Sequence, residues 1–84
     1  MERIAPGMLA YSRAGHDKDT LYYIVKADDR FVWLSDGVLK PVEAPKKKSL
    51  RHIQVILNDM NQMPEQLTNE AVKRIIKQYP RKEL

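Results

Sequence analysis

The chain has 84 residues, a net charge of +4 and no cysteine. This length allows one domain and buries only about 60–65% of the surface of the unfolded chain, which disfavours a deep catalytic cleft. Without cysteine, neither disulfides nor thiolate zinc sites can brace the fold. No apolar run approaches the roughly 20 residues that cross a bilayer, and the first residues lack the apolar core of a signal peptide. We therefore expect a cytoplasmic protein that does not use a membrane as partner.

The first half of the chain is predicted to form four short strands. Three of them are rich in apolar, β-branched and aromatic residues, and they span residues 8–13, 20–26 and 31–34. The segment between the first two strands indicates a loop, in which Gly15 supplies a backbone angle that other residues resist. Asp36-Gly37 is typical of a type I′ hairpin turn, so residues 38–43 are predicted to return as a fourth strand. Pro41 places that strand at a sheet edge or at a bulge.

The C-terminal part is predicted to be an amphipathic helix. Its apolar residues recur at positions i, i+3, i+4 and i+7, namely Val72, Ile75, Ile76 and Tyr79. Thr68 or Asn69 can cap the first turn, and Pro80 ends the helix. Because a helix of about eleven residues is marginal alone, this stripe is expected to pack against the strands. A docking face for a partner is the alternative.

Together these segments predict a mostly-β protein with about five short strands and one C-terminal α-helix. The last short strand, or a turn of helix, falls within residues 50–57. The strands at 20–26 and 31–34 are apolar on both faces, which suits a small barrel that is filled inside and covered outside. The predicted organisation is a barrel over residues 1–57, a linker over 58–67 and a helix over 68–79.

The excess of positive charge lies in one short segment. Residues 40–52 have a net charge of +4, from one acid, Glu43, and five cations: Lys40, Lys46, Lys47, Lys48 and Arg51. Such clustering indicates contact with a polyanion. Lysine is a mobile point charge with three donors. The flanking Pro45 keeps the backbone near extended geometry, so that neighbouring lysines project in different directions. The alternative is a solvated loop or a charged guard at a strand edge.

A second group of candidate contacts lies in the loop after the first strand, namely Arg13, His16 and Lys18. Arginine can bind a phosphate through two hydrogen bonds, and an exposed histidine can stack on a base. Asp17 and Asp19 bring the charge of this loop close to zero, so local ion pairing is equally compatible with the sequence.

The sequence shows no catalytic or metal-binding constellation. The two histidines are far apart, and the carboxylate pairs Asp17/Asp19 and Asp28/Asp29 have no third ligand at metal spacing. A glycine-rich phosphate loop, a nucleophile elbow and a thiol are all missing from the sequence. We therefore expect no enzymatic activity, no cofactor and no metal. The aromatic residues are predicted to fill the core more than to stack on bases: Tyr11, Tyr22, Tyr23, Phe31 and Trp33. The expected exception is Tyr11, because it lies next to the loop.

Several short stretches occur in the order and spacing of a known family: Pro6-Gly7, Ser12 to Lys18, Tyr22 to Val25, Ser35-Asp36-Gly37, Lys40-Pro41-Val42, Pro45 to Lys48 and Leu50 to Ile53. In this order they resemble the KOW-domain RNA-binding proteins, in particular small bacterial relatives of the KOW-type archaeal and eukaryotic large-subunit ribosomal proteins. The resemblance implies an SH3-like β-barrel that binds RNA, usually ribosomal, through the loop after the first strand and through basic edges. Asp19 stands where that family commonly has a second glycine.

Two functions are therefore carried forward. The first is a non-enzymatic RNA-binding module that acts in translation, associated with the ribosome or its RNA. Its candidate contacts are Arg13, His16, Lys18, Lys40, Lys46, Lys47, Lys48, Arg51 and His52, with Gly15, Asp36 and Gly37 as structural turn residues. The alternative is an SH3-like protein-interaction adaptor that uses the barrel edge and the helix stripe. The expected partners are RNA and ribosomal proteins, and the free protein is expected to be a monomer.

Overall fold

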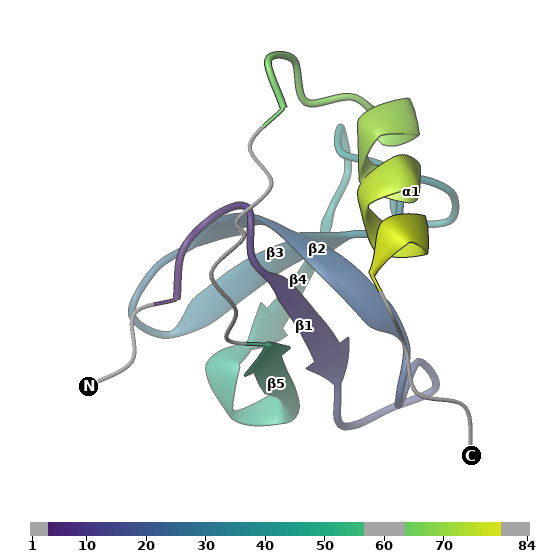
Figure 1. Ribbon diagram of the computed structural model, residues 1–84. Coiled ribbons are helices and arrows are strands. Elements are labelled where there is room, and N and C mark those ends of the chain that lie inside the picture. The colour runs from purple at the N-terminus through teal and green to yellow at the C-terminus, as the bar shows by residue number, and fades with distance from the viewer. Residues whose placement is uncertain (1–3, 57–63, 80–84) are drawn as a thin grey trace.

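The structure is a computed structural model that describes residues 4–56 and 64–79 (Figure 1). These residues form five strands, one short 3₁₀ helix and one α-helix. The elements are β1 (Leu9–Ser12), β2 (Leu21–Ala27), β3 (Phe31–Ser35), β4 (Lys46–Ser49), η1 (Leu50–His52), β5 (Ile53–Ile56) and α1 (Asn69–Gln78). The mostly-β architecture with a C-terminal helix is therefore confirmed.

The strands form one antiparallel sheet in the order β4-β3-β2-β1-β5. Strands β1 to β4 pair in sequence order, and β5 returns to pair with β1, so β4 and β5 are the two edges. These edges are joined only by η1, the short turn between them in Figure 1, so the sheet curls until its edges approach at one corner. In the described part of the chain no ladder pairs β4 with β5, and the sheet is not closed into a barrel.

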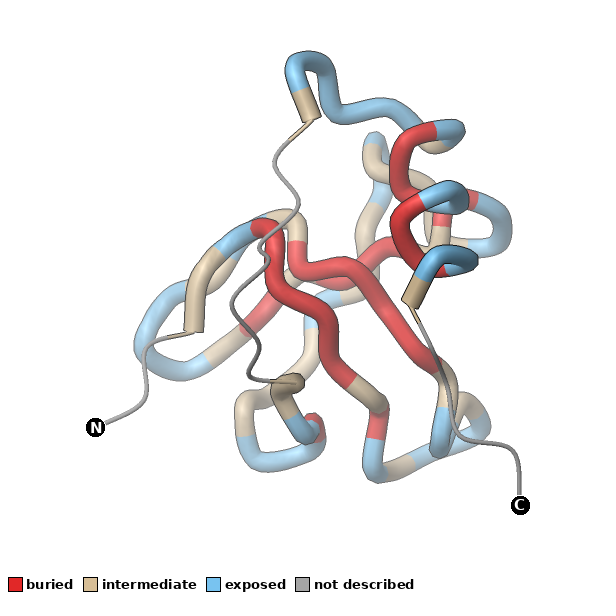
Figure 2. The backbone as a smooth tube through the Cα atoms, viewed as in Figure 1, coloured by how far each residue is buried: buried red, intermediate tan, exposed pale blue. Residues whose placement is uncertain are grey.

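Each face of the sheet has its own apolar cluster. The inner face carries Met8, Ala10, Tyr22, Ile24, Val32, Leu34 and Ile53. The outer face packs on α1 through Leu9, Leu21, Tyr23, Val72, Ile75 and Ile76. Neighbouring residues of β1 and β2 enter opposite clusters, as the two-residue period of a strand requires. Figure 2 shows this buried backbone along β1, β2 and the side of α1 that faces them.

The predicted core aromatics divide into two groups. Tyr22 and Tyr23 are buried, and Tyr11 packs against the outer cluster. Phe31 and Trp33 are half-buried and belong to neither cluster, so the prediction that they fill the core is wrong. Both residues alternate with Val32 and Leu34 of the inner cluster and therefore lie on the outer face.

Helix α1 lies within residues 68–79, where the apolar spacing predicts a helix. Thr68 is its N-cap, and its Oγ1 accepts a hydrogen bond from the N–H of Ala71 at 3.1 Å. Val72 is fully buried against the sheet, which is worth about 2 kcal/mol for a side chain of this size. In the predicted linker, residues 64–67 form no helix or strand. Residues 58–63 and Pro80 lie outside the described residues.

The predicted strand at residues 38–43 is wrong, because that segment is an irregular loop. The fourth strand is instead the lysine-rich stretch Lys46–Ser49. Asp36 Oδ1 accepts hydrogen bonds from the backbone N–H groups of Val38 and Lys40, both at 2.9 Å. These local bonds take the donors that a strand ladder would use, so the chain turns on itself before it can extend.

This loop is held against the first turn of α1. Asn69 Oδ1 accepts a hydrogen bond from the N–H of Val42 at 2.8 Å, and Asn69 Nδ2 donates to Glu43 Oε1 at 3.1 Å. Gly37 adopts a φ of +78°, and a Cβ atom there would lie 2.6 Å from the carbonyl oxygen of Asn69. Glycine is therefore needed for its conformation and for the close approach of the helix, and Asp36-Gly37 begins a long connection instead of a two-residue hairpin.

Candidate nucleic-acid interface

Asp17, in the loop between β1 and β2, is the centre of a polar cluster at the inner face of the sheet. Lys46 Nζ lies 2.8 Å from Asp17 Oδ2, and Lys48 Nζ lies 2.9 Å from Oδ1. The Tyr22 hydroxyl donates to Oδ2 at 2.9 Å, and Ser12 Oγ lies 2.9 Å from Oδ1. One carboxylate is thus surrounded by four donors, which come from β1, β2 and β4. We call these five residues the Asp17 cluster.

The Asp17 cluster has one stable protonation state. Burial raises the pKa of the Asp17 carboxyl, but the hydrogen bonds from Lys46, Lys48, Tyr22 and Ser12 outweigh burial and hold the pKa well below its usual range. Burial and the hydrogen bond to Asp17 raise the pKa of the Tyr22 hydroxyl above its usual range. The carboxylate therefore stays ionised and the phenol stays protonated across the physiological range.

Lys46 and Lys48 are consequently not the mobile cations that the sequence indicates. In the register of the sheet they lie opposite Leu34 and Val32, on the inner face. The Lys48 side chain is only 9% exposed, and its ammonium also donates to a backbone carbonyl, at residue 14, at 2.9 Å. Neighbouring lysines do project in different directions, because Lys47 points to the outer face.

The outer face of β2, β3 and β4 carries a row of rings and lysines that we call the aromatic–lysine row: Lys26, Phe31, Trp33 and Lys47. Lys26 and Lys47 are the register partners of Trp33 on its two sides. Lys26 Nζ lies 4.8 Å from the centre of the Trp33 ring. Lys47 Nζ lies 4.2 Å from the centre of the Phe31 ring and 5.6 Å from that of Trp33. Lys47 therefore contacts aromatic rings on the outer face, whereas Lys46 and Lys48 pair with Asp17 on the inner face.

The other predicted contacts lie on two segments that the fold joins. The N–H of Arg13 donates to the carbonyl oxygen of His52 at 2.8 Å, directly after the pairing of β1 with β5. The loop after β1 therefore meets η1. We call the exposed side chains on these two segments the basic end, and they make no ion pair with another described residue: Arg13, His16, Lys18, Arg51 and His52.

A shallow hollow of about 370 Å³ lies beside the basic end. Arg13, Lys18 and the carboxylate-bearing Asp19 line it, together with Gln54 of β5. Lys40 lies on the loop between β3 and β4, and none of the described hydrogen bonds joins that loop to the basic end. The structure therefore joins the predicted contacts of the first loop to those of η1 by a hydrogen bond, but not Lys40.

Two residues of the loop after β1 have positive φ angles, as the resembled family implies for its two glycine positions. Gly15 has a φ of +85°, and Asp19 adopts a φ of +73°. Aspartate is one of the few residues that tolerate this region, so the loop is formed although Asp19 stands where the resembled family has glycine. The N–H of Asp19 donates to the carbonyl oxygen of Ser12 at 2.8 Å, which fixes the loop against β1.

Sequence reasoning also missed Arg30, which the fold brings to η1. The N–H of Leu50 donates to the carbonyl oxygen of Arg30 at 2.9 Å. The same turn contains Asp28, whose carboxylate accepts hydrogen bonds from the N–H groups of Arg30 and Phe31 at 2.8 and 2.7 Å. These backbone bonds, together with the charges of Lys47 and Lys26, lower the pKa of Asp28. Nothing in the sequence spacing signals this approach.

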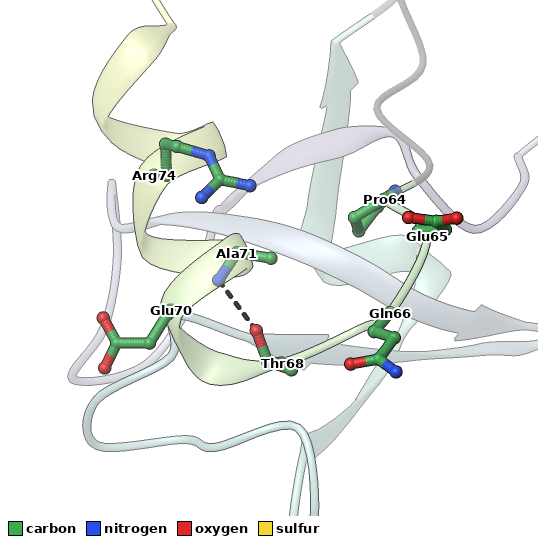
Figure 3. A pocket seen from close by; sticks show the side chains of 7 residues that line it. All are labelled: Pro64, Glu65, Gln66, Thr68, Glu70, Ala71 and Arg74. Atoms are coloured by element: carbon green, nitrogen blue, oxygen red, sulfur yellow. Dashed lines mark hydrogen bonds between the residues drawn. The ribbon is translucent and has the colours of Figure 1, made fainter.

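A second hollow, of about 530 Å³, lies at the start of α1 (Figure 3). Glu65, Glu70 and Arg74 line it, so its charge is mixed and does not favour a polyanion. Within residues 4–56 and 64–79, no three histidine, aspartate or glutamate side chains gather closely enough to hold a metal ion. None of the helices in those ranges is long and apolar enough to span a membrane.

No protein-family model matches the chain, and the comparison with curated proteins finds no match either.

Proposed function

We propose that this protein is a non-enzymatic RNA-binding module of the KOW type, associated with the ribosome or its RNA. The observation that supports it is the hydrogen bond between Arg13 and His52. It joins the loop after β1 to η1. These two segments, with the two lysines of β4 that pair with Asp17, hold two carboxylates, Asp17 and Asp19, and five cations: Arg13, Lys18, Lys46, Lys48 and Arg51. Such a concentration of positive charge at one end of a small domain favours a polyanion.

The Asp17 cluster contributes to this proposal indirectly. Asp17 would repel phosphate if its charge were open to solvent, but Lys46 and Lys48 lie on both of its oxygens and leave one positive charge over. The direct contacts are then the exposed arginines, Arg13 and Arg51, which can each hold a phosphate through two hydrogen bonds. Such contacts position the RNA without reading its sequence.

The finer fold proposal is a partly open SH3-like barrel. Three features support it. The strands β1 to β4 follow one another across the sheet, and β5 returns to β1. The two edges are joined by the three residues of η1. The side-chain cluster around Asp17 also links the loop after β1 to β4, across the inner face where the backbone ladder is open.

Salt dependence tests the proposed mechanism. If about four phosphates are neutralised, the log–log slope for single-stranded RNA should be about −2.8, and the affinity should fall about 50-fold between 50 and 200 mM salt. The double change Arg13→Gln and Arg51→Gln should lower the magnitude of this slope by about 1.4. Arg74→Gln, at an exposed position of α1, is the matched control and should leave the slope unchanged. A flat salt response of the unmodified protein would refute phosphate contact.

Association with ribosomes is a separate measurement. We expect the protein to co-sediment with ribosomes in a sucrose gradient at low salt and to be released at high salt. Recovery in the free fraction alone at low salt would contradict association with the ribosome. General affinity for RNA is tested separately, by the salt-dependent binding assay.

One observation favours a protein-interaction adaptor as a second candidate. Val38 and Leu39, at the tip of the loop between β3 and β4, are 65% and 81% exposed. The helix stripe is not available for this purpose, because Val72 and Ile75 are buried against the sheet. A specific partner that stays bound after ribonuclease treatment, and is lost after Val38→Ser with Leu39→Ser, would favour the adaptor.

A further inference from the structure

The aromatic–lysine row is a surface that neither core cluster nor α1 explains. Phe31 and Trp33 are large rings, and burial of such rings is a major source of stability, yet both stand outside the two clusters. Each ring has a lysine ammonium within 5 Å of its centre. The row crosses three strands, because Lys26, Trp33 and Lys47 are partners in register.

The charges around the row are complementary to a polyanion. Two lysines flank Trp33 from both sides, and neither makes an ion pair with another described residue. Asp28, at the turn between β2 and β3, interacts electrostatically with both lysines without forming an ion pair, and its carboxylate accepts hydrogen bonds from the backbone N–H groups of Arg30 and Phe31. One carboxylate against two ammonium groups leaves the row positively charged. An apolar protein partner would gain little from that charge, whereas RNA supplies both a flat ring and phosphates.

Whether a ligand can reach the rings depends on two competing contacts of the same ring: the cation–π contact with lysine and the stacking of a nucleobase. An exposed cation–π contact contributes about two- to fivefold to an equilibrium. Stacking of one nucleobase on an aromatic side chain contributes about five- to 150-fold. A base can therefore displace a lysine from the ring with net gain, and the displaced ammonium is then free to bind the phosphate next to that base.

We propose that the aromatic–lysine row is a second RNA-contact face, which stacks unpaired nucleobases on Trp33 and Phe31 while Lys26 and Lys47 hold the adjoining phosphates. Bases in a duplex are already stacked on one another, so this face selects single-stranded segments. The choice of RNA as ligand rests on the proposed function, but the face and its residues are distinct from the basic end.

Trp33 is the only tryptophan, so its fluorescence reports on this face directly. The full chain is titrated with a single-stranded oligouridylate, with an RNA duplex of equal phosphate number and with inorganic polyphosphate. We expect the single strand to quench Trp33 and the other two ligands to bind without comparable quenching. Equal quenching by polyphosphate, or no quenching by a single strand whose binding is measured independently, would overturn the stacking proposal.

Substitutions then separate the two faces. Trp33→Leu and Phe31→Leu should each weaken single-strand binding about 5- to 100-fold and leave polyphosphate binding unchanged. Trp33→Phe keeps a ring and should retain affinity within about threefold, with circular dichroism as the test of folding. Arg13→Gln is the control at the basic end and should weaken both ligands. Unchanged single-strand binding in a folded Trp33→Leu protein refutes the stacking face alone, whereas no binding of any polyanion by the unmodified protein refutes the proposed function.

Discussion

Asp17→Asn is expected to destabilise the fold strongly, because it removes the charge at the centre of the Asp17 cluster. Among the described residues, the change removes the one carboxylate that forms an ion pair with Lys48, whose side chain is 9% exposed. Loss of one partner of a buried ion pair costs about 3–5 kcal/mol. Because Asp17 is 14% exposed and the asparagine amide keeps one acceptor oxygen, we expect about 2–3 kcal/mol of lost unfolding free energy. For a domain of this size this corresponds to a fall in Tm of about 10–20 °C.

The assay is thermal and urea unfolding followed by circular dichroism. Asp19→Asn is the matched control, because it removes an exposed carboxylate from the same loop and asparagine tolerates the positive φ of that position. We expect the control to change stability by less than about 0.5 kcal/mol. An Asp17→Asn protein as stable as the control would refute the claim that the cluster holds the loop to β4. The double change of Asp17→Asn with Lys48→Met should cost less than the sum of the single changes.

The effect of Asp17→Asn should also depend on pH in a defined direction. The pKa of Asp17 is lowered in the folded state, whereas that of an unfolded aspartate is about 3.9. The stabilisation is therefore complete above about pH 5 and is lost as the pH falls below the unfolded value toward the folded one. The difference in unfolding free energy between the two proteins should narrow from pH 4.5 to pH 2. A difference that widens there would contradict this assignment.

Other substitutions test the packing of α1 and of the loops. Gly37→Ala should cost about 2–3 kcal/mol, because it adds a left-handed strain and places a Cβ atom 2.6 Å from Asn69 O. Gly15→Ala shares the positive φ but meets nothing nearer than 3.5 Å, so it should cost only about 1 kcal/mol by the same unfolding measurement. Thr68→Ala removes the N-cap acceptor for Ala71 and should cost about 1 kcal/mol, whereas Thr68→Ser should restore most of it.

The elements that the sequence predicts correctly are those rich in apolar residues. The strands β2 and β3 follow from runs of β-branched and aromatic residues, and the helix α1 follows from the i, i+3, i+4 spacing of a stripe that packs against the sheet. The fourth strand does not follow from such a pattern. Three consecutive lysines are typical of a segment exposed to solvent. Only the register with β3 shows that Lys46 and Lys48 face the inner side of the sheet. Gly37 has the positive φ that the Asp36-Gly37 pair predicts. The pair does not form a two-residue hairpin, because the Asp36 carboxylate accepts hydrogen bonds from the N–H groups of Val38 and Lys40 and so holds these residues in a loop.

The residues of the candidate site can be predicted from the sequence, but their contacts with one another cannot. The basic segment and the loop after β1 are both visible in the sequence, yet their junction depends on the hydrogen bond from Arg13 to His52. The partners of Asp17 lie 29 and 31 positions away, so a local reading pairs that carboxylate with the cations of its own loop instead. The aromatic–lysine row is hidden for the same reason, since Lys26 and Lys47 become neighbours of Trp33 only through strand pairing.

The order of strands in the sheet also has a consequence for folding rates. The ladders β1–β2, β2–β3 and β3–β4 each join strands that follow one another, while β1–β5 joins the first strand to the last and must close the longest loop. The Asp17 cluster likewise joins distant segments, so its contacts are expected to form after the rate-limiting step. Asp17→Asn should then accelerate unfolding and leave the folding rate nearly unchanged, which makes this cluster a determinant of how long the native state persists.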